Sequence, residues 1–365
     1  MRIFVDGYLL NKEYQGTRTY ITELYKALAK MNPNYIIHFG VNFISDELEN
    51  EFKDYKNISF YVFKQKNKWK RMFSEYAKLS NVYDYMHFQY IIPFLKFNKK
   101  CKYINTVHDV LFLDFPNDFP LAYRLSRKIL FGYSSRKADL LLTVSEYSKQ
   151  RIAKHFNINE SKIYITPNGV NDKLLESYDV EKVKKYVYEK YGLENFILYV
   201  SRIEPRKNQT QLLKLYAEDS DVHSKNNLVF IGKQSLESAD FNAFYQGLDV
   251  SIKNKVLYIE QVPNSELINF YRAANSFVYP SLCEGFGIPP LEAAACGIPV
   301  LCNRKTAMED FKMLQPYLVD FSSDNITKLF HSFIFNNESD IEKIKTEIEN
   351  LYTWQISAKQ INQLL

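Results

Sequence analysis

Short apolar runs alternate along the chain with stretches of helical periodicity. In the first half, the apolar runs predict seven strands, at residues 3–5, 36–39, 58–63, 83–88, 102–107, 140–144 and 163–165. Helical periodicity is clearest at residues 19–30 and 121–138. Strands that alternate with helices in this way are typical of a parallel sheet covered by helices on both faces.

A second series of strands and helices begins after a polar helix predicted at residues 180–191. Its predicted strands are residues 196–200, 228–231, 256–259, 276–279 and 298–301, and its predicted helices are residues 208–217, 265–274 and 289–296. The turn-rich segment 168–172 separates the two series, and a last helix, 339–365, has a possible break at 352–354. The pattern predicts an α/β fold of two Rossmann-like, doubly wound domains facing each other across a cleft. Ligands of such sheets bind outside the carboxyl ends of the strands.

Length and composition agree with two globular domains. The chain has 365 residues, and a single hydrophobic core stops growing at roughly 250–300 residues. Apolar residues make up 46% of the chain and charged residues 24%. This is ordinary globular usage, and it excludes an intrinsically disordered protein.

Several features bear on the compartment. The opening residues, Met-Arg-Ile-Phe-Val-Asp, are typical of a buried strand and not of a secretory signal. No apolar run approaches the ~18 residues of a membrane span. The four cysteines (Cys101, Cys283, Cys296 and Cys302) form no Cys-x-x-Cys pair and no zinc-like cluster. We therefore expect reduced, structural cysteines, no bound metal, and a cytoplasmic protein that at most rests on the inner face of the membrane.

Positive charge gathers in the first half of the chain. Residues 1–170 contain 26 Lys and Arg against 16 Asp and Glu, whereas residues 171–365 contain 21 against 26. A dense basic patch, residues 64–73, includes Trp69 and Phe73, and a second patch comprises Lys96, Lys99, Lys100 and Lys102. Two interpretations stay open: a solvated helix face, or contact with an anionic membrane, where each cation contributes about 1 kcal/mol. No nucleic-acid-binding motif accompanies the charge, so no nucleic acid partner is expected.

The densest chemical signal follows the predicted strand that ends at Tyr279. A loop with Gly285 and Gly287 comes next, and Pro289 opens a helix, where proline suits the first turn. The glycines let the backbone approach a ligand, and a helix N-terminus presents free N–H groups to an anion. This segment therefore indicates a site for a phosphate-bearing ligand.

Two glutamates belong to the same segment. Glu292 lies about one turn inside the helix, where its carboxylate can accept both hydroxyls of a ribose. Glu284 precedes the helix, beside the expected anion, so a sugar hydroxyl is its more sensible partner. The alternative is that both glutamates merely cap the start of the helix.

The string from Glu284 to Glu292, Glu-Gly-Phe-Gly-Ile-Pro-Pro-Leu-Glu, resembles the hallmark of glycosyltransferase family 4, the retaining enzymes of the GT-B fold. The resemblance implies an acceptor-binding domain at residues 1–170, a nucleotide-sugar-binding domain at 171–350, and a C-terminal helix at 351–365 that crosses back to the first domain. In this string the implied donor-binding residues are Glu284, Gly285, Phe286, Gly287, Ile288 and Glu292.

Other segments resemble the same family. Arg202 and Lys207 follow the first strand of the second domain, where two cations can neutralise a diphosphate leaving group without a metal. His108, followed by Asp109, resembles the His-Asp segment of mannosyl- and rhamnosyl-transferring branches, which implies contact with the donor hexose. Gly16, at the first strand-to-helix turn, permits close approach to the diphosphate and the acceptor. The implied catalytic residues are His108, Arg202, Lys207 and Glu284.

The resemblance implies a retaining, metal-independent hexosyltransferase. GDP-mannose is the first choice of donor, with UDP-sugars behind it, and no cofactor is expected besides this substrate. The expected acceptor is a glycan or lipid-linked glycan in surface polysaccharide or lipopolysaccharide biosynthesis. No carboxylate plainly serves as a nucleophile, so we expect a same-face substitution in which the leaving diphosphate accepts the proton of the incoming hydroxyl.

Three alternatives stay open. A sugar-nucleotide epimerase of the same architecture would convert the nucleotide sugar itself and need no acceptor. A non-catalytic family member acting as a binding partner should have lost charged residues, whereas Arg202, Lys207, Glu284 and Glu292 are all present. A nicotinamide dehydrogenase would need a Gly-x-Gly-x-x-Gly turn with a following acidic residue, and the first strand-to-helix turn lacks it.

Overall fold

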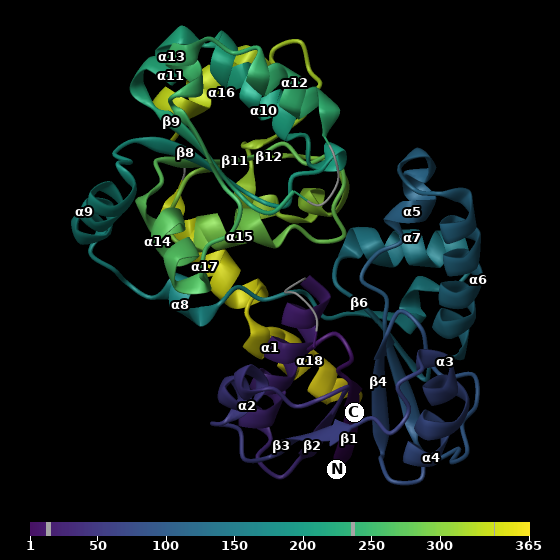
Figure 1. The fold of residues 1–365 in the computed structure, drawn as a ribbon. Coiled ribbons are helices and arrows are strands. Elements are labelled where there is room, and N and C mark those ends of the chain that lie inside the picture. Colours follow the sequence, from purple (N-terminus) through teal and green to yellow (C-terminus); the bar gives the residue numbers. More distant parts are fainter. Residues whose placement is uncertain (12–15, 235–237, 339) are drawn as a thin grey trace. The chain divides into compact units, whose positions relative to one another are not determined.

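The structure is a computed structural model that describes residues 1–11, 16–234, 238–338 and 340–365. The chain folds into two compact units (Figure 1): residues 1–169 together with 354–365, and residues 170–353. The sequence placed the boundaries after residues 170 and 350, so the chain returns to the first unit three residues later than expected.

The first unit is built on a parallel sheet with the strand order β3-β2-β1-β4-β5-β6-β7. Every predicted strand of this half is present, with ends shifted by at most two residues. The strands are β1 (Arg2–Asp6), β2 (Ile36–Val41), β3 (Ile58–Val62), β4 (Tyr85–Gln89), β5 (Lys102–Thr106), β6 (Leu140–Thr143) and β7 (Ile163–Ile165). The order reverses between β1 and β4, which is the switch point where doubly wound sheets bind ligands.

Helices cover this sheet. The two predicted helices are confirmed as α1 (Gly16–Met31) and α6 (Leu121–Lys137). Helices that the sequence analysis did not predict are α2 (Asp46–Phe52), α3 (Lys68–Lys70), α4 (Tyr76–Leu79), α5 (Leu111–Asp114) and α7 (Glu146–Phe156). A π-helical turn, Arg71–Glu75, joins α3 to α4. Most of these additions are short, and short helices carry little periodicity.

The predicted break in the last helix is confirmed. α17 (Ile341–Leu351) ends in the second unit, and α18 (Trp354–Leu364) belongs to the first. α18 lies against α1 (Figure 1), and the Asn362 side-chain oxygen accepts hydrogen bonds from Asn32 Nδ2 at 3.1 Å and Tyr35 OH at 2.9 Å. The end of the chain is therefore an integral part of the first unit.

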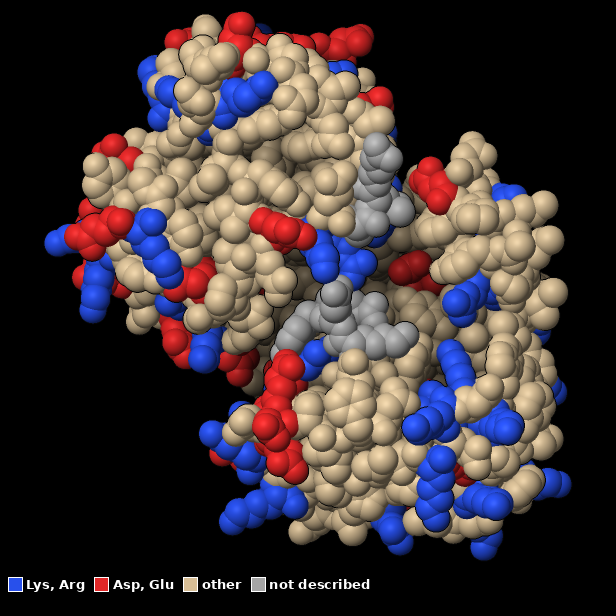
Figure 2. Space-filling view, in the orientation of Figure 1, with Lys and Arg blue, Asp and Glu red and all other residues tan. Residues whose placement is uncertain are grey.

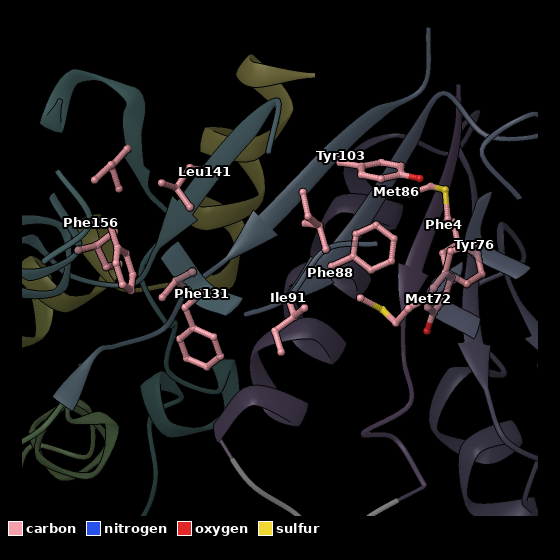
Figure 3. Close-up of a cluster of buried hydrophobic side chains, with 14 of the residues drawn as sticks. Phe4, Met72, Tyr76, Met86, Phe88, Ile91, Tyr103, Phe131, Leu141 and Phe156 are labelled. Atoms are coloured by element: carbon pink, nitrogen blue, oxygen red, sulfur yellow. The ribbon is translucent and has the colours of Figure 1, made fainter. Parts of the chain in front are cut away.

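Aromatic side chains fill the core of the first unit. Figure 3 shows Phe4, Tyr76, Met86 and Phe88 gathered on one part of the sheet, and all four are buried. Phe4 and Tyr76 meet edge to face with centroids 6.1 Å apart, an arrangement that aromatic quadrupoles favour. The high aromatic content is thus used mainly for packing.

The second unit repeats the same topology. Its parallel sheet has the order β10-β9-β8-β11-β12-β13, with the switch point between β8 and β11. The strands are β8 (Phe196–Val200), β9 (Asn227–Ile231), β10 (Val256–Ile259), β11 (Ser276–Tyr279), β12 (Val300–Asn303) and β13 (Leu318–Val319). The sequence analysis missed β13, which has only two residues.

Helices of the second unit include all four that were predicted. These are α9 (Val180–Tyr191), α10 (Gln209–Glu218), α14 (Asn264–Ala273) and α15 (Ile288–Ala295). α17 is the first part of the predicted last helix, and the helices that were not predicted are α8 (Asp172–Leu175), α11 (Ser220–Lys225), α12 (Ala239–Gln246), α13 (Val250–Lys253) and α16 (Ile326–Asn336). The α/β fold with two doubly wound sheets is confirmed.

The basic patch 64–73 is only partly a surface feature. Lys68 and Lys70 are exposed, and Lys and Arg gather on the face of the first unit that carries α3 (Figure 2). Arg71, however, is buried with 4% of its surface exposed. The interpretation of the whole patch as a solvated helix face is therefore wrong for its π-helical part.

The cysteine prediction is confirmed, since all four cysteines are buried and free. Within the described ranges, no helix is both long and apolar enough to cross a membrane.

Candidate active site

The switch point of the second sheet carries a buried ion pair. β8 runs into a short 3-10 helix, Pro205–Lys207, whose last residue is 7% exposed. Lys207 Nζ lies 2.5 Å from Glu284 Oε1 and donates a weaker hydrogen bond to Tyr279 OH at 3.3 Å. Because Tyr279 ends β11, the neighbouring strand, the carboxyl ends of β8 and β11 bring these predicted residues together.

One carboxylate oxygen of Glu284, Oε1, is hydrogen-bonded to other side chains of the protein. Oε1 accepts hydrogen bonds from Tyr279 OH at 2.8 Å and Ser281 Oγ at 2.7 Å besides the bond from Lys207. Arg206 NH1 lies 3.9 Å from Oε2. No hydrogen bond to Oε2 comes from any residue in the described parts of the chain, so this oxygen has room to accept one from a ligand.

The charge state of Glu284 follows from these neighbours. Burial raises the pKa of its carboxyl, but the charges of Lys207 and Arg206 and the hydrogen bonds from Lys207 and Ser281 outweigh that effect and hold the pKa below its ordinary value. Glu284 is therefore an ionised acceptor at neutral pH.

Arg202 lies at the start of the loop after β8 and is exposed. Gly232, in the corresponding loop after β9, has φ of 151°, and a Cβ there would come within 1.9 Å of the Ser201 carbonyl oxygen. Only glycine fits so close an approach. Gly232, which the sequence analysis did not identify, thus fixes the backbone that presents Arg202.

The loop from β11 into α15 has the predicted form. Gly287 has φ of 97° and directly precedes the helix, where prolines occupy the first turn. The backbone N–H of Glu284 donates to Thr306 Oγ1 at 2.8 Å, which anchors the loop. The Phe286 side chain is buried against Phe311 and Tyr352, with ring centroids 5.5 and 5.9 Å away. Only the backbone of Phe286 is left to contact a donor.

Glu292 lies in the second turn of α15 and is partly buried. Its Oε2 accepts a hydrogen bond from Tyr271 OH at 2.8 Å. Burial raises its pKa, and the bond from Tyr271 offsets only part of the effect. The cap of α15 is Gly287, which makes no side-chain capping bond. The interpretation of Glu284 and Glu292 as a capping pair is therefore wrong.

The first unit holds the other two predicted residues. Gly16 is exposed at the start of α1, and the preceding Gln15 lies outside the described residues. His108 follows β5 and is buried, with Nε2 2.8 Å from Gln89 Oε1 and its ring 4.9 Å from that of Tyr20. Burial lowers the pKa of His108 to about 3. Its imidazole is therefore neutral at neutral pH, suited to a hydrogen bond and not to a charge.

Sequence reasoning missed several contributors to the site. Tyr279 and Ser281 stand within the recognised motif, so their closeness to Glu284 could have been found. Arg206 precedes Lys207 and forms an ion pair with Glu204 at 2.5 Å. Thr306, 22 residues after Glu284 in the chain, shows no signal in the sequence.

Two doubly wound sheets, one with paired glutamates before and within a helix at its switch point, define the GT-B class of glycosyltransferases. Each half of the chain matches a family model. Residues 14–174 match Glycosyltransferase Family 4, and residues 181–356 match Glycosyl transferases group 1. The chain belongs to this family of group 1 glycosyltransferases.

Two curated relatives are named as mannosyltransferases. The chain is 31% identical over 212 residues to O-antigen chain mannosyltransferase B of Escherichia coli, covering 57% of this chain and 54% of the relative. It is 33% identical over 200 residues to O-antigen chain mannosyltransferase RfbU of Salmonella typhimurium, covering 54% and 51%. The chain thus spans about half the length of the curated relatives it matches.

Solved structures show the same fold along the whole chain. Anabaena HepE in complex with UDP-glucose has a TM-score of 0.75 and 14% identity, covering 100% of this chain and 98% of that chain. WaaG, a glycosyltransferase involved in lipopolysaccharide biosynthesis, has a TM-score of 0.70 and 15% identity, covering 98% of each. At these identities the likeness concerns the fold.

Proposed function

We propose that this chain is a retaining hexosyltransferase that moves mannose from a nucleotide diphosphate sugar to a glycan or lipid-linked acceptor in surface polysaccharide biosynthesis. The observation that carries the proposal is the ionised Glu284, held on one oxygen by Lys207, Tyr279 and Ser281 with its other oxygen open. The relatives named as O-antigen mannosyltransferases support the choice of mannose.

The donor would bind through charges and dipoles at the second switch point. Lys207 has three N–H groups, of which two are directed at Glu284 and Tyr279, so one remains for a phosphate oxygen. The exposed Arg202 and the N-terminus of α15 supply further positive character for the diphosphate. In this arrangement Glu292 holds the ribose, and Glu284 Oε2 accepts a hydroxyl of the hexose.

In the proposed reaction, negative charge develops on the departing diphosphate. The bond between the anomeric carbon and the phosphate oxygen breaks, and the acceptor oxygen forms its bond to the same face of that carbon. The acceptor proton passes to the leaving phosphate oxygen, so no protein base is required. Arg202 and Lys207 stabilise the departing diphosphate, and a preorganised donor of this kind typically contributes about 10²–10³ in rate. The family resemblance assigns neutral His108 to the hexose.

The first experiment is a thermal-shift panel of nucleoside diphosphates and their sugars without added metal. A true donor at about 100 times its Kd should stabilise the chain by ~2.7 kcal/mol. We expect one base to stand out, GDP before UDP, and Glu292→Ala to remove its stabilisation while the control Glu260→Ala retains it. If no nucleotide stabilises the chain, the proposal fails.

Turnover separates the proposed function from the epimerase alternative. We expect release of nucleoside diphosphate to depend on an acceptor. Conversion of the nucleotide sugar into an epimer with no acceptor present would contradict a transferase.

A further inference from the structure

A turn after β12 lies against the loop that carries Glu284, and its first residue has an unusual backbone. Thr306 opens a 3-10 helix, Thr306–Asp310, with φ of 61°. Among the described residues other than glycine that have positive φ, it is the only β-branched one. The left-handed region is a steric outlier for a β-branched residue. Such conformations persist where the surrounding structure enforces them, and they cluster at functional sites.

The hydroxyl of Thr306 is fixed by one donor and one acceptor. The backbone N–H of Glu284 donates to Oγ1 at 2.8 Å, and the hydroxyl donates its own hydrogen to the Lys305 carbonyl oxygen at 2.7 Å. The next residue, Ala307, donates from its N–H to the Glu284 carbonyl oxygen at 3.4 Å. Two consecutive residues of the turn therefore hold the backbone of Glu284 on both its N–H and its carbonyl.

The rest of the same turn packs against the glycine loop. A Cβ at Gly287 would come within 3.2 Å of Met308 Cγ, so the loop and the turn are in close contact there. The Phe286 ring meets the Phe311 ring edge to face, with centroids 5.5 Å apart. Met308 and Phe311 are both buried. Because this contact is tightly packed, a change in the backbone of the turn should move the loop as well.

The backbone of Glu284 decides where its free carboxylate oxygen lies. Oε1 is held by Lys207, Tyr279 and Ser281. With Oε1 held at one end of the side chain and the backbone held at the other, few rotamers satisfy both ends. Oε2 is then fixed in one position. Without the Thr306 hydroxyl, the Glu284 N–H loses this partner and the backbone end of the side chain is less restrained.

We propose that Thr306 is a positioning residue that fixes Glu284 Oε2 for the hydroxyl of the donor hexose. The proposal rests on the proposed function, in which Oε2 binds the hexose. The nucleoside diphosphate is held there by other residues, Arg202, Lys207 and Glu292. Thr306 should therefore affect how tightly the sugar part of the donor is bound and leave the binding of the nucleoside diphosphate nearly unchanged.

The test is calorimetric titration of the full chain with a nucleotide sugar and, separately, with its nucleoside diphosphate. The pair is taken from the base that stabilises the unmodified chain, GDP-mannose and GDP before UDP-glucose and UDP. We expect Thr306→Val to weaken nucleotide-sugar binding about tenfold and nucleoside diphosphate binding by less than about twofold. The matched control is Thr346→Val in α17, which removes an exposed hydroxyl that donates to the Glu342 carbonyl. It should change neither affinity by more than about twofold.

Two further variants separate the hydroxyl from the strained backbone. Thr306→Gly adopts positive φ without strain, so it folds even if Thr306→Val does not, and it should show the same selective loss. Thr306→Ser keeps the hydroxyl and should recover most of the nucleotide-sugar affinity. Unchanged nucleotide-sugar binding in Thr306→Gly, or equal weakening of both ligands, would overturn the proposal.

A double-variant cycle tests whether Thr306 acts through Glu284. In a Glu284→Ala background, Thr306→Gly should have no further effect on nucleotide-sugar binding, because the oxygen that it positions is gone. A second tenfold loss in that background would contradict the proposed role.

Failure of this inference differs from failure of the proposed function. A chain that binds both ligands, with affinities that Thr306→Gly does not change, contradicts the inference alone. A chain that binds no nucleotide contradicts the proposed function.

Discussion

Each of the two sheets has a buried cation near the carboxyl ends of its strands, and the two cations differ in how their charge is balanced. Lys207 in the second unit meets Glu284 at 2.5 Å, with Tyr279 and Ser281 completing the cluster. In the first unit, the Arg71 guanidinium contacts the amide oxygen of Asn42 and the aromatic ring of Phe63. No carboxylate in the described parts of the chain lies within ion-pair distance of Arg71, although its charge acts to lower the pKa of the buried Asp6. The two cations should therefore respond differently to substitution.

The largest effect is expected from breaking the balanced pair. Lys207→Met leaves the carboxylate of Glu284 buried without its main counter-charge, and such a loss costs about 3–5 kcal/mol. Turnover should fall by about 10²–10³ as well. Urea denaturation and nucleoside diphosphate release measure the two effects. The double variant with Glu284→Gln should recover part of the stability and none of the activity. If Lys207→Met unfolds like the unmodified chain, Lys207 and Glu284 are not energetically coupled.

Arg202 should separate activity from stability. Because Arg202 is exposed, Arg202→Ala should change the free energy of unfolding by less than about 0.5 kcal/mol while reducing turnover by about 10²–10³. Arg206→Ala is the matched control, since Arg206 pairs with Glu204 and should lower both quantities. Wild-type turnover in Arg202→Ala would remove this residue from the site.

The two glutamates should show opposite dependence of stability on pH. The pKa of Glu284 lies below its ordinary value of 4.5 in the folded chain. Its ionised form therefore stabilises the fold above pH 4.5, and that contribution is lost as the pH falls towards the lower folded pKa. The pKa of Glu292 is raised, so its ionised form destabilises the fold above the raised pKa, and the cost disappears in acid.

The predicted directions of the pH dependence of stability are tested by denaturing Glu284→Gln and Glu292→Gln at a series of pH values from neutral to acid. At neutral pH, Glu284→Gln should be less stable than the unmodified chain and Glu292→Gln more stable. Both differences should shrink as the pH falls. Differences of the same sign would contradict the contrast between the two environments.

The smallest effect is expected from the unbalanced cation. Arg71→Met removes a buried charge that no carboxylate of a described residue approaches within ion-pair distance, so the free energy of unfolding should change by no more than about 1 kcal/mol, or increase. Urea denaturation beside the exposed control Lys70→Met measures it. A loss comparable to that of Lys207→Met would show that Arg71 is a structural residue.

Local patterns in the sequence predict much of the fold because each apolar run or helical repeat is made of residues that lie close together in the chain. The strand, glycine loop and helix around Glu284 form one continuous segment, so their arrangement could be predicted from the sequence. The two-residue β13 was too short to leave a pattern.

What the sequence does not show is which distant side chains meet. Arg71 is one of several cations in a basic run, and only the π-helical turn, which also directs Met72 into the core, reveals that it is buried. Phe286 lies in a motif that suggests ligand contact, yet its ring packs against Phe311 and Tyr352. Burial of this kind is decided by tertiary packing, which one-dimensional patterns do not carry.

The chain passes between its two units twice, once at residues 169–170 and once at 353–354. The Val170 N–H donates to the Tyr352 carbonyl at 2.8 Å, and Val170 pairs with Thr353 in a parallel bridge. Topologically, the second unit is therefore an insertion whose entrance and exit are fastened to each other. A short linker from Gly169 to Trp354 would excise it and leave the first unit with its covering helix α18, whereas simple truncation after Gly169 would strip that helix from α1.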